Sequence, residues 1–392
     1  MRILGIETSC DETSAAIVEG QPNNYKVRFL SNVVTSSLNL HSETGGIIPE
    51  IAAREQVKYI IPVIKKALTL YSSSDQAKPE SREVNNETMK QLNNETIDAI
   101  AVTVGPGLIG SLLVGVETAR TLSYVWKKPI IPVNHLIGHI YANFIQRTDD
   151  RRQKADVFSP PIFPAIALIV SGGHTDLVLL KNHGAIKWLG GTRDDAAGEA
   201  FDKIGRLLNL PYPGGPAIEK EAKMGNPKAH PFPRPMINSK DFDFSFSGLK
   251  TAALREIQGV RTYSSSESRA KSRESREVPR DKFSTGSNNK IISNMAASVQ
   301  QAIIDVLVTK TLKAAQKYKV KSILLGGGVA ANQKLRDELQ LKIENFKLKI
   351  QLSVPPKDLC TDNAAMIATA AFFNYKKVPW QKITANPELY FE

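Results

Sequence analysis

The feature that most constrains this chain is an architectural repeat. Residues 2–19 (RILGIETSCDETSAAIVE) and 164–180 (PAIALIVSGGHTDLVLL) each combine an apolar strand, a small polar turn and a second strand. In each half a later strand runs into a glycine-rich turn and then a helix, at 98–119 (DAIAVTVGPGLIGSLLVGVETA) and 321–340 (KSILLGGGVAANQKLRDELQ). A pattern that recurs in the same order predicts two similar lobes.

Hydrophobic periodicity predicts alternating strands and helices along the chain. Strands are predicted where short apolar runs are rich in β-branched residues, at 2–7, 14–19, 98–104, 129–133, 164–171, 175–180 and 321–325. Helices are predicted at 49–70, 109–126, 194–209, 216–224, 289–318, 332–343 and 362–375. This alternation is typical of an α/β protein.

A small polar turn at the end of a buried strand exposes backbone N–H groups that can hold phosphate oxygens. Two such turns facing one cleft would grip a nucleotide. The pattern therefore favours duplicated lobes of the actin/hexokinase/Hsp70-like (RNase H-like) α/β fold around a central nucleotide cleft, with a doubly wound sheet as the alternative. We expect an N-terminal lobe at 1–133 and a C-terminal lobe at 134–392, with a helical subregion at about 194–250.

Charge and cysteine content narrow the setting in which the protein works. The formal net charge of +12 fits a phosphate-rich partner, although it serves solubility equally well. The only cysteines, Cys10 and Cys360, exclude a disulfide framework and indicate a reducing compartment. No stretch approaches the ~18 uninterrupted apolar residues of a membrane span, and the first residues lack the apolar core of a signal peptide. We therefore expect a soluble, cytoplasmic protein without membrane contact.

Two segments interrupt the α/β pattern, at about 71–96 and 258–290. Both are poor in large apolar residues and rich in Ser, Asn, Glu and Arg, so neither can bury enough surface to fold alone. We interpret both as inserts in surface loops and expect the second to be disordered. Its arginines favour a solvated loop, with an RNA contact as the alternative.

The sequence VNHLIGHIYANF contains the best candidate metal ligands. His135 and His139 are four residues apart, so on a helix both imidazoles project from one face and suit one metal ion. The third ligand we expect is Asp362, for which a helix N-cap is the alternative. Leu136 stands where a zinc protease needs its general-base Glu, which disfavours that function. Two imidazoles and one carboxylate suit Fe(II) or Zn(II) as a Lewis acid.

Several glycine turns and polar side chains are candidates for nucleotide binding. Ser171, Gly172 and Gly173 would let a phosphate or carbonyl approach the backbone closely, if they do not simply form a hairpin turn. Asn332 would either cap a helix or reach a ribose or base. Asp202 lies among apolar residues of a predicted helix and could hold ribose hydroxyls. In contrast, the alternating phenylalanines of 241–252 (DFDFSFSGLKTA) predict a strand buried on one face.

Taken together, the motifs resemble the TsaD-type tRNA N6-adenosine threonylcarbamoyltransferases, in their bacterial and organellar branch. The resemblance covers nearly the whole chain outside the two inserts. It rests on IETSCDETS (6–14), HSETGGIIPEIAARE (41–55), VGPGLIGSLLVG (104–115), NHLIGH (134–139), VSGGHT (170–175), DDAAGEAFDK (194–203), YPGGP (212–216), FSFSGLKTA (244–252), GGGVAAN (326–332) and CTDNAAMIA (360–368).

The resemblance implies a reaction and a set of site residues. The family transfers a threonylcarbamoyl group from threonylcarbamoyl-AMP to N6 of adenosine 37 in tRNAs that read codons beginning with A. The implied ligands of one divalent ion, Fe or Zn, are His135, His139 and Asp362. The adenylate, or ATP or ADP in its place, would be held by Ile169, Val170, Ser171, Gly172, Gly173, Asp202, Gly215, Glu219 and Asn332. Asp11 and Glu12 are candidates for taking a proton from the amine.

The family also implies partners, namely tRNA, an inactive TsaB-type paralogue and a TsaE-type P-loop ATPase. The chain departs from many bacterial relatives at Ile137, where they have Glu, and at Gln56, where they have His. These changes affect the surroundings of the metal and hence its identity. Three alternatives remain at this point: a small-molecule kinase or ATPase of the same fold, a metalloprotease, and a non-enzymatic ATP-dependent scaffold. The histidine pair disfavours the kinase, since kinases hold Mg²⁺ through carboxylates and water.

Overall fold

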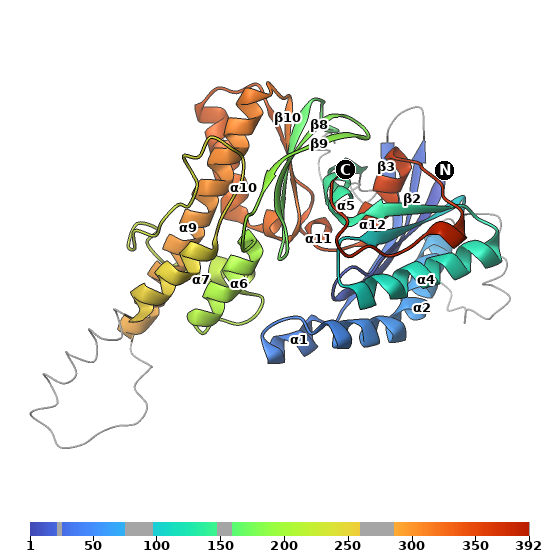
Figure 1. Cartoon of the computed structure of the whole chain (residues 1–392), viewed down its shortest axis with the longest axis horizontal. Coiled ribbons are helices and arrows are strands. Elements are labelled where there is room, and N and C mark those ends of the chain that lie inside the picture. Colours follow the sequence, from blue (N-terminus) through green and yellow to red (C-terminus); the bar gives the residue numbers. More distant parts are fainter. Residues whose placement is uncertain (22–25, 75–96, 147–158, 259–285, 392) are drawn as a thin grey trace, which may run out of the picture.

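The chain folds around two β-sheets with helices on their faces, in a computed structural model that describes residues 1–21, 26–74, 97–146, 159–258 and 286–391 (Figure 1). The first sheet has strand order β5-β4-β1-β2-β3-β6 and the second has order β11-β10-β7-β8-β9. In Figure 1 the first sheet lies on the right with the blue and teal helices, and the second lies on the left with the green, yellow and orange helices.

The first sheet is built from the N-terminal part of the chain. Its strands are β1 (Arg2–Glu7), β2 (Glu12–Gln21), β3 (Lys26–Ser36), β4 (Ala99–Gly105), β5 (Ile130–Asn134) and β6 (Ile145–Gln146). β1 pairs antiparallel with β2 and parallel with β4, which in turn pairs parallel with β5. Helices α2 (Pro49–Ser74) and α4 (Ile109–Trp126) supply apolar side chains to the core against this sheet, and α1 (Leu38–Thr44) precedes α2.

The second sheet repeats this arrangement. Its strands are β7 (Ala165–Val170), β8 (Thr175–Asn182), β9 (Ala185–Gly191), β10 (Ser322–Gly326) and β11 (Gln351–Ser353). As in the first sheet, the leading strand β7 pairs antiparallel with the next strand, β8, and parallel with a later strand, β10. The duplicated actin/hexokinase/Hsp70-like fold expected from the sequence is therefore confirmed.

The helices outside the first sheet's own set form an outer set and an inner set. The outer set around the second sheet comprises α6 (Ala197–Leu207), α7 (Gly214–Ala222), α9 (Gly286–Lys317) and α10 (Gln333–Asn345). The inner set, α5 (His135–Tyr141) and α12 (Ala364–Phe373), lies between the two sheets (Figure 1). One core cluster joins residues of both sheets with these two helices. Gly5 of β1 allows α12 to pack closely, because a Cβ at this position would lie 2.3 Å from the Ala364 carbonyl oxygen.

Helix α9 contains a segment, Asn289–Lys317, that is long and apolar enough to cross a membrane by length and composition alone. However, 72% of the apolar 18-residue window within this segment is buried inside the protein. Its apolar residues, such as Ile303 and Leu307, belong to the core cluster of the second lobe. The segment is therefore the core helix of that lobe.

Most predicted elements are confirmed to within a few residues, and the misses have physical causes. No strand forms at 241–247, where Phe244 makes only an isolated bridge to Thr192. Phe242, Phe244 and Phe246 are nevertheless buried as expected. The Asp194 carboxylate holds the backbone here by accepting hydrogen bonds from the N–H groups of Phe246 and Ser247.

The periodic pattern did not predict strands β3 and β9, helix α1, the helix at 247–258, or the short elements β6, β11 (Gln351–Ser353) and α11 (Lys357–Cys360). The two predicted inserts lie largely outside the described residues. Helix α2 continues through Ser74, and α9 begins at Gly286.

Candidate functional site

Helix α5 presents His135 and His139 together. The Asn134 side chain caps the helix, because its Oδ1 accepts from the N–H groups of Leu136 at 2.8 Å and Ile137 at 3.4 Å. Gly138 lets the helix pack closely on α12, since a Cβ there would lie 2.7 Å from Ile367 Cδ1. The two imidazole rings come from the same side of the helix, with centroids 4.6 Å apart. The spacing in the sequence therefore gives the arrangement that was expected.

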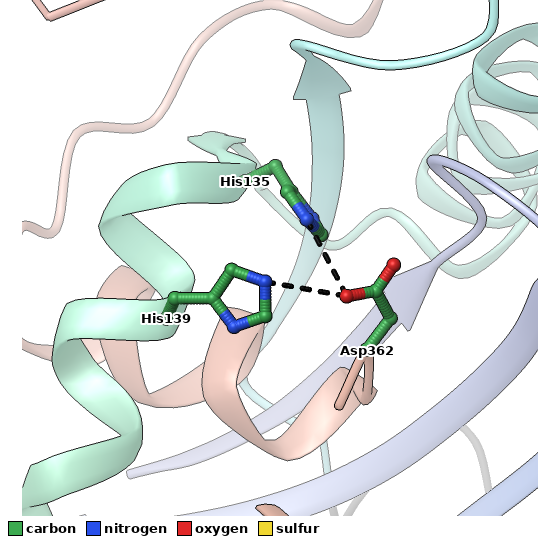
Figure 2. A group of neighbouring side chains, drawn as sticks. All are labelled: His135, His139 and Asp362. Atoms are coloured by element: carbon green, nitrogen blue, oxygen red, sulfur yellow. Dashed lines mark ion pairs between the residues drawn. The ribbon is translucent and has the colours of Figure 1, made fainter. Parts of the chain in front are cut away.

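Asp362 lies opposite the two imidazoles and immediately precedes the N-cap of α12 (Figure 2). Its Oδ1 is 3.2 Å from His139 Nε2 and 3.5 Å from His135 Nε2. The cap of α12 is Asn363, whose Oδ1 accepts from Met366 N–H, so the alternative interpretation of Asp362 as a helix cap is wrong. One ligand atom from each of the three residues lies within 4.8 Å of the others.

The residues present fit a metal ion. The His139 side chain is only 1% exposed, its Nδ1 has no hydrogen-bond partner among the described residues, and its Nε2 faces Asp362 Oδ1 at 3.2 Å without the alignment of a hydrogen bond. Buried polar groups are almost always satisfied, so an unsatisfied imidazole needs a partner. A divalent cation is the partner that two imidazoles and a carboxylate would share.

The electrostatics of the cluster favour bound positive charge. Burial alone would lower the pKa of His135, but the carboxylates of Asp362 and Glu7 raise it to about 9. Burial would raise the pKa of Asp362, but His135 and His139 lower it to about 2. Burial lowers the pKa of His139, whose imidazole thus tends to be neutral and able to bind a metal. The site therefore stabilises a carboxylate beside a position for a cation.

Sequence reasoning missed Glu7, which orients His135. Glu7 is fully buried at the end of β1, and its Oε2 lies 3.2 Å from His135 Nδ1. The same carboxylate accepts hydrogen bonds from Ser9 N–H at 2.6 Å and from the Thr103 hydroxyl. A carboxylate on the far nitrogen of a ligating histidine fixes the ring and its tautomer. Ser9 Oγ also lies 3.1 Å from His135 Nδ1.

Strand topology explains why these residues meet. β1, β4 and β5 are mutually parallel neighbours, so their carboxyl ends lie at one edge of the sheet. Glu7 ends β1, Thr103 lies near the end of β4, and β5 leads directly into His135. Ligands of open α/β sheets bind at this edge. A sequence signal existed only in that a glutamate closes an otherwise apolar strand.

Gln56 and Ile137, which the sequence singled out, have different roles. Gln56 is fully buried, and its Nε2 donates towards the carbonyl oxygens of Thr8, Cys10 and Glu12, at 3.3, 2.9 and 3.0 Å. It therefore organises the polar turn between β1 and β2. Ile137 packs instead against the core cluster between the sheets.

The candidate acid–base residues Asp11 and Glu12 occupy this same turn. Asp11 is 7% exposed and accepts a hydrogen bond from the Ser36 hydroxyl at 3.2 Å. Burial, followed by the negative charges of Asp362 and Asp11, raises the pKa of Glu12 well above its usual value. The structure thus brings the Glu12 carboxyl group into the electrostatic surroundings of Asp362 and Asp11.

The predicted nucleotide turn between β7 and β8 is open to a ligand. Ile169 and Val170 are buried at the end of β7, and Ser171 begins the turn. Gly172 and Gly173 are exposed, and a Cβ at either would meet no atom within 4 Å. Their backbone therefore faces space that a ligand can approach.

The glycines after β10 join this turn to the metal ligands. A Cβ at Gly326 would lie 2.8 Å from the His139 carbonyl oxygen. A Cβ at Gly327, whose φ is +86°, would lie 2.4 Å from the Val170 carbonyl oxygen. Gly326 and Gly327 thus pack between α5 and β7. The histidine pair on α5 and the open turn after β7 therefore lie side by side.

The remaining predicted polar residues make protein contacts. Asp202 Oδ1 accepts from Gly214 N–H at 2.7 Å, next to Gly215. Glu219 accepts from Gln333 N–H at 2.8 Å. Asn332 does cap α10, through Leu335 N–H, and also donates to Gln300.

Helix α6 connects this group to the open turn. A Cβ at Gly198 would lie 2.4 Å from the Ser171 carbonyl oxygen, and one at Gly214 would lie 2.6 Å from Asp202 Cα. Helix α6 therefore links Asp202 and the neighbouring Gly214 to the turn at Ser171.

Comparison with known proteins supports one family across both lobes. The model of the family TsaD, tRNA N6-adenosine threonylcarbamoyltransferase, matches residues 28–369. The tRNA N6-adenosine threonylcarbamoyltransferase of Moorella thermoacetica is 43% identical over 98% of this chain and 95% of its own length. That of Thermomicrobium roseum is 46% identical over 95% of this chain and 92% of its own. Among solved structures, full-length HypF in its phosphate- and nucleotide-bound form aligns over 95% of this chain and 46% of that one, with 11% identity and a TM-score of 0.49.

Proposed function

This chain belongs to the TsaD family of tRNA N6-adenosine threonylcarbamoyltransferases, and from that premise we propose how its residues carry out the reaction. The chain is a transferase that modifies tRNA with a threonylcarbamoyl group. The donor we propose is threonylcarbamoyl-AMP. The acceptor is N6 of adenosine 37, beside the anticodon of tRNAs that read codons beginning with A.

One observation carries this proposal, namely that the His135, His139 and Asp362 cluster adjoins an open glycine turn. The connection runs through Gly326, which touches the backbone of His139, and Gly327, which touches that of Val170. A group held by its phosphate at the turn would extend its acyl carbon towards the cluster. Proximity of this kind converts a bimolecular step into an effectively unimolecular one.

We assign His135, His139 and Asp362 as the ligands of one divalent ion, Fe or Zn, because two imidazoles and a carboxylate suit both. When bound, the ion supplies Lewis-acid polarisation of the acyl carbonyl, which a weakly nucleophilic aromatic amine requires. Glu7 holds the ring of His135 in the orientation that leaves Nε2 free for this purpose.

The bond changes balance without any further reactant. The N6–acyl carbon bond forms, and the bond between the acyl carbon and the phosphate oxygen breaks. AMP leaves with that electron pair, and N6 loses a proton. We propose Glu12, with Asp11 beside it, as the acceptor of that proton, because burial raises the pKa of Glu12 and makes it a stronger base.

The adenylate cradle we propose comprises Ile169, Val170, Ser171, Gly172, Gly173, Asp202, Gly215, Glu219 and Asn332. The exposed backbone of Gly172 and Gly173 would receive the phosphate. Asp202, Glu219 and Asn332 would turn from their protein partners towards the ribose and base when the site fills. ATP or ADP would fit the same cradle.

We further propose that the enzyme works in the cytoplasm with a TsaB-type paralogue and a TsaE-type P-loop ATPase, as its family resemblance implies. The net charge of +12 suits a polyanionic tRNA substrate. The proposed division of the chain at residue 133 assigns β5 up to Val133 to the first lobe and leaves Asn134 and His135 at the start of the second.

The proposal is tested by incubating the purified chain with unmodified tRNA and threonylcarbamoyl-AMP, with and without the two partners. Nucleosides are then analysed by mass spectrometry and released AMP is measured. We expect N6-threonylcarbamoyladenosine and AMP in equal amounts. Nucleotide binding with unmodified tRNA under every partner combination would favour the scaffold alternative instead.

A further inference from the structure

Residues 385–391, which we call the strap, run along the carboxyl edge of the first sheet and end between the lobes. Asn386 N–H donates to the Val104 carbonyl at 2.6 Å, and Gly107 N–H donates to the Pro387 carbonyl at 3.3 Å. Leu389 packs against the core cluster under this sheet. In Figure 1 the end marked C lies beside α5. The strap is therefore attached to the first lobe at the sheet edge that carries the site.

Tyr390 attaches the strap to the second lobe. Its hydroxyl donates to Asp176 Oδ1, which also accepts from Trp188 Nε1 at 2.9 Å. Asp176 is 1% exposed, and its Oδ2 has no hydrogen-bond partner among the described residues. Because Asp176 is the second residue of β8, it directly follows the open turn at Ser171. The phenol therefore anchors the base of the proposed phosphate turn.

The backbone of the same residue reaches the helix of the metal ligands. The Tyr390 carbonyl accepts from Asn134 Nδ2 at 3.1 Å. Asn134 Oδ1 is thereby turned towards α5, where it caps the N–H groups of Leu136 and Ile137. One residue thus connects Asp176, on the second sheet, to the N-terminus of α5, which follows β5 of the first sheet.

We propose that Tyr390 is a positioning residue that sets the distance and orientation between the metal ligands on α5 and the donor turn after β7. The inference rests on the proposed function. In this role Tyr390 acts through Asn134 on one side and Asp176 on the other. Its loss would keep every ligating and donor-binding residue, but it would loosen the support of α5 and misplace one half-site relative to the other.

Two substitutions test the two connections separately. Tyr390→Phe keeps the ring and the carbonyl but removes the donor to Asp176. Asn134→Asp keeps an N-cap oxygen, since Asp and Asn cap equally well, but removes the donor to Tyr390. We expect each to lower kcat roughly tenfold or more, as small misplacements of reacting groups do, with KM for threonylcarbamoyl-AMP within about twofold. The double variant should lose little more than the worse single variant, because both break one connection.

Zn²⁺ affinity, measured by competition with a chromogenic chelator, gives a readout that is independent of the reaction. We expect Asn134→Asp to weaken it by about tenfold, as loss of support around ligating histidines does. Tyr375→Phe, at a 44% exposed tyrosine, is the matched control and should leave all values native.

Native kcat in both folded variants, or a lower melting temperature as the only change, would overturn the proposal. Additive losses in the double variant would overturn it as well. If the native chain itself makes no modified tRNA, the proposed function fails, while the Zn²⁺ affinities still report on the strap.

Discussion

Glu7, at the end of β1, is 0% exposed and has no cation of lysine or arginine beside it in the described structure; its partners are Ser9, Thr103 and His135. A buried carboxylate is costly unless its partners compensate for lost solvation. The histidine and two donors provide that compensation. Glu7 is therefore specified by the site rather than by the stability of the strand.

Replacing Glu7 with Gln tests this role at the scale of a single residue. Gln keeps the size and an acceptor oxygen but loses the charge that supports His135, so we expect Zn²⁺ affinity to fall about tenfold. Chelator competition at constant pH measures the change. Glu19→Gln, in the same β-hairpin but paired with Arg2 and Arg28, is the control. Equal affinities in Glu7→Gln and the native chain would contradict the role assigned to Glu7.

The candidate residues differed in how far the sequence could reveal them. His135 and His139 lie four residues apart on one helix, so local spacing is enough to suggest a shared ligand. Asp362 lies more than 200 positions away, and only the family resemblance joined it firmly to the pair. Glu7 could not be recognised, because its function depends on the neighbouring positions of β1, β4 and β5, which are tertiary facts.

At the scale of elements, the glycine turns shape the site. Alanine substitutions at two of these glycines should have opposite effects. Gly172 faces open space, whereas a Cβ at Gly326 would meet the His139 backbone at 2.8 Å. The first glycine leaves room for a ligand, and the second leaves room for a helix.

We expect Gly172→Ala to keep the native melting temperature but to weaken AMP binding by about tenfold, since a methyl group intrudes where phosphate would lie. Gly326→Ala should instead lower the melting temperature and Zn²⁺ affinity, because α5 must shift. Calorimetric titration with AMP and thermal unfolding separate the two. Native AMP affinity in Gly172→Ala would remove the turn at Ser171 from the donor site.

Helices and strands were predicted correctly where local periodicity decides the structure. They were missed where a contact with a residue distant in the sequence competes with that periodicity. The helix at 109–126 was predicted to the residue, because its buried residues recur every three or four positions, at Leu112, Val116, Ala119, Ser123 and Trp126. The strand predicted around Phe244 did not form, because Asp194 holds the Phe246 and Ser247 N–H groups that a strand would need. A single carboxylate distant in sequence thus overrides an alternating pattern.

At the scale of the whole molecule, the two lobes share a core. Side chains of both sheets pack with α5 and α12 in one cluster, so the site lies over a continuous apolar seam. The repeat in the sequence predicted two lobes, but it carried no information on this seam. His183 lies beside it, stacked on Phe373 with ring centroids 4.2 Å apart and with Nδ1 3.2 Å from the Tyr141 hydroxyl.

His183 makes stability depend on pH. Partial burial lowers its pKa from 6.5 to about 4, so the unfolded chain binds the proton more readily than the folded chain. Stability from this group is complete above about pH 6.5 and is lost as the pH falls towards 4, by about 1 kcal/mol between pH 7 and 5 after allowance for solvent. Denaturant unfolding should show the stability difference between the native chain and His183→Leu shrinking over that range. A difference that stays constant would contradict the assignment.

The most direct test of the account is threonylcarbamoyl transfer by His139→Ala, measured by nucleoside mass spectrometry beside His230→Ala. His230 pairs with Glu256 in the second lobe, so its loss removes a histidine without touching the cluster. Both proteins are stripped with a chelator and then resupplied with Fe(II) or Zn(II) in the presence of tRNA, threonylcarbamoyl-AMP and the partner proteins. The account predicts that the metal restores modified adenosine in His230→Ala and in the native chain, while His139→Ala forms none. Undiminished product from His139→Ala, or from metal-free native protein, would contradict it.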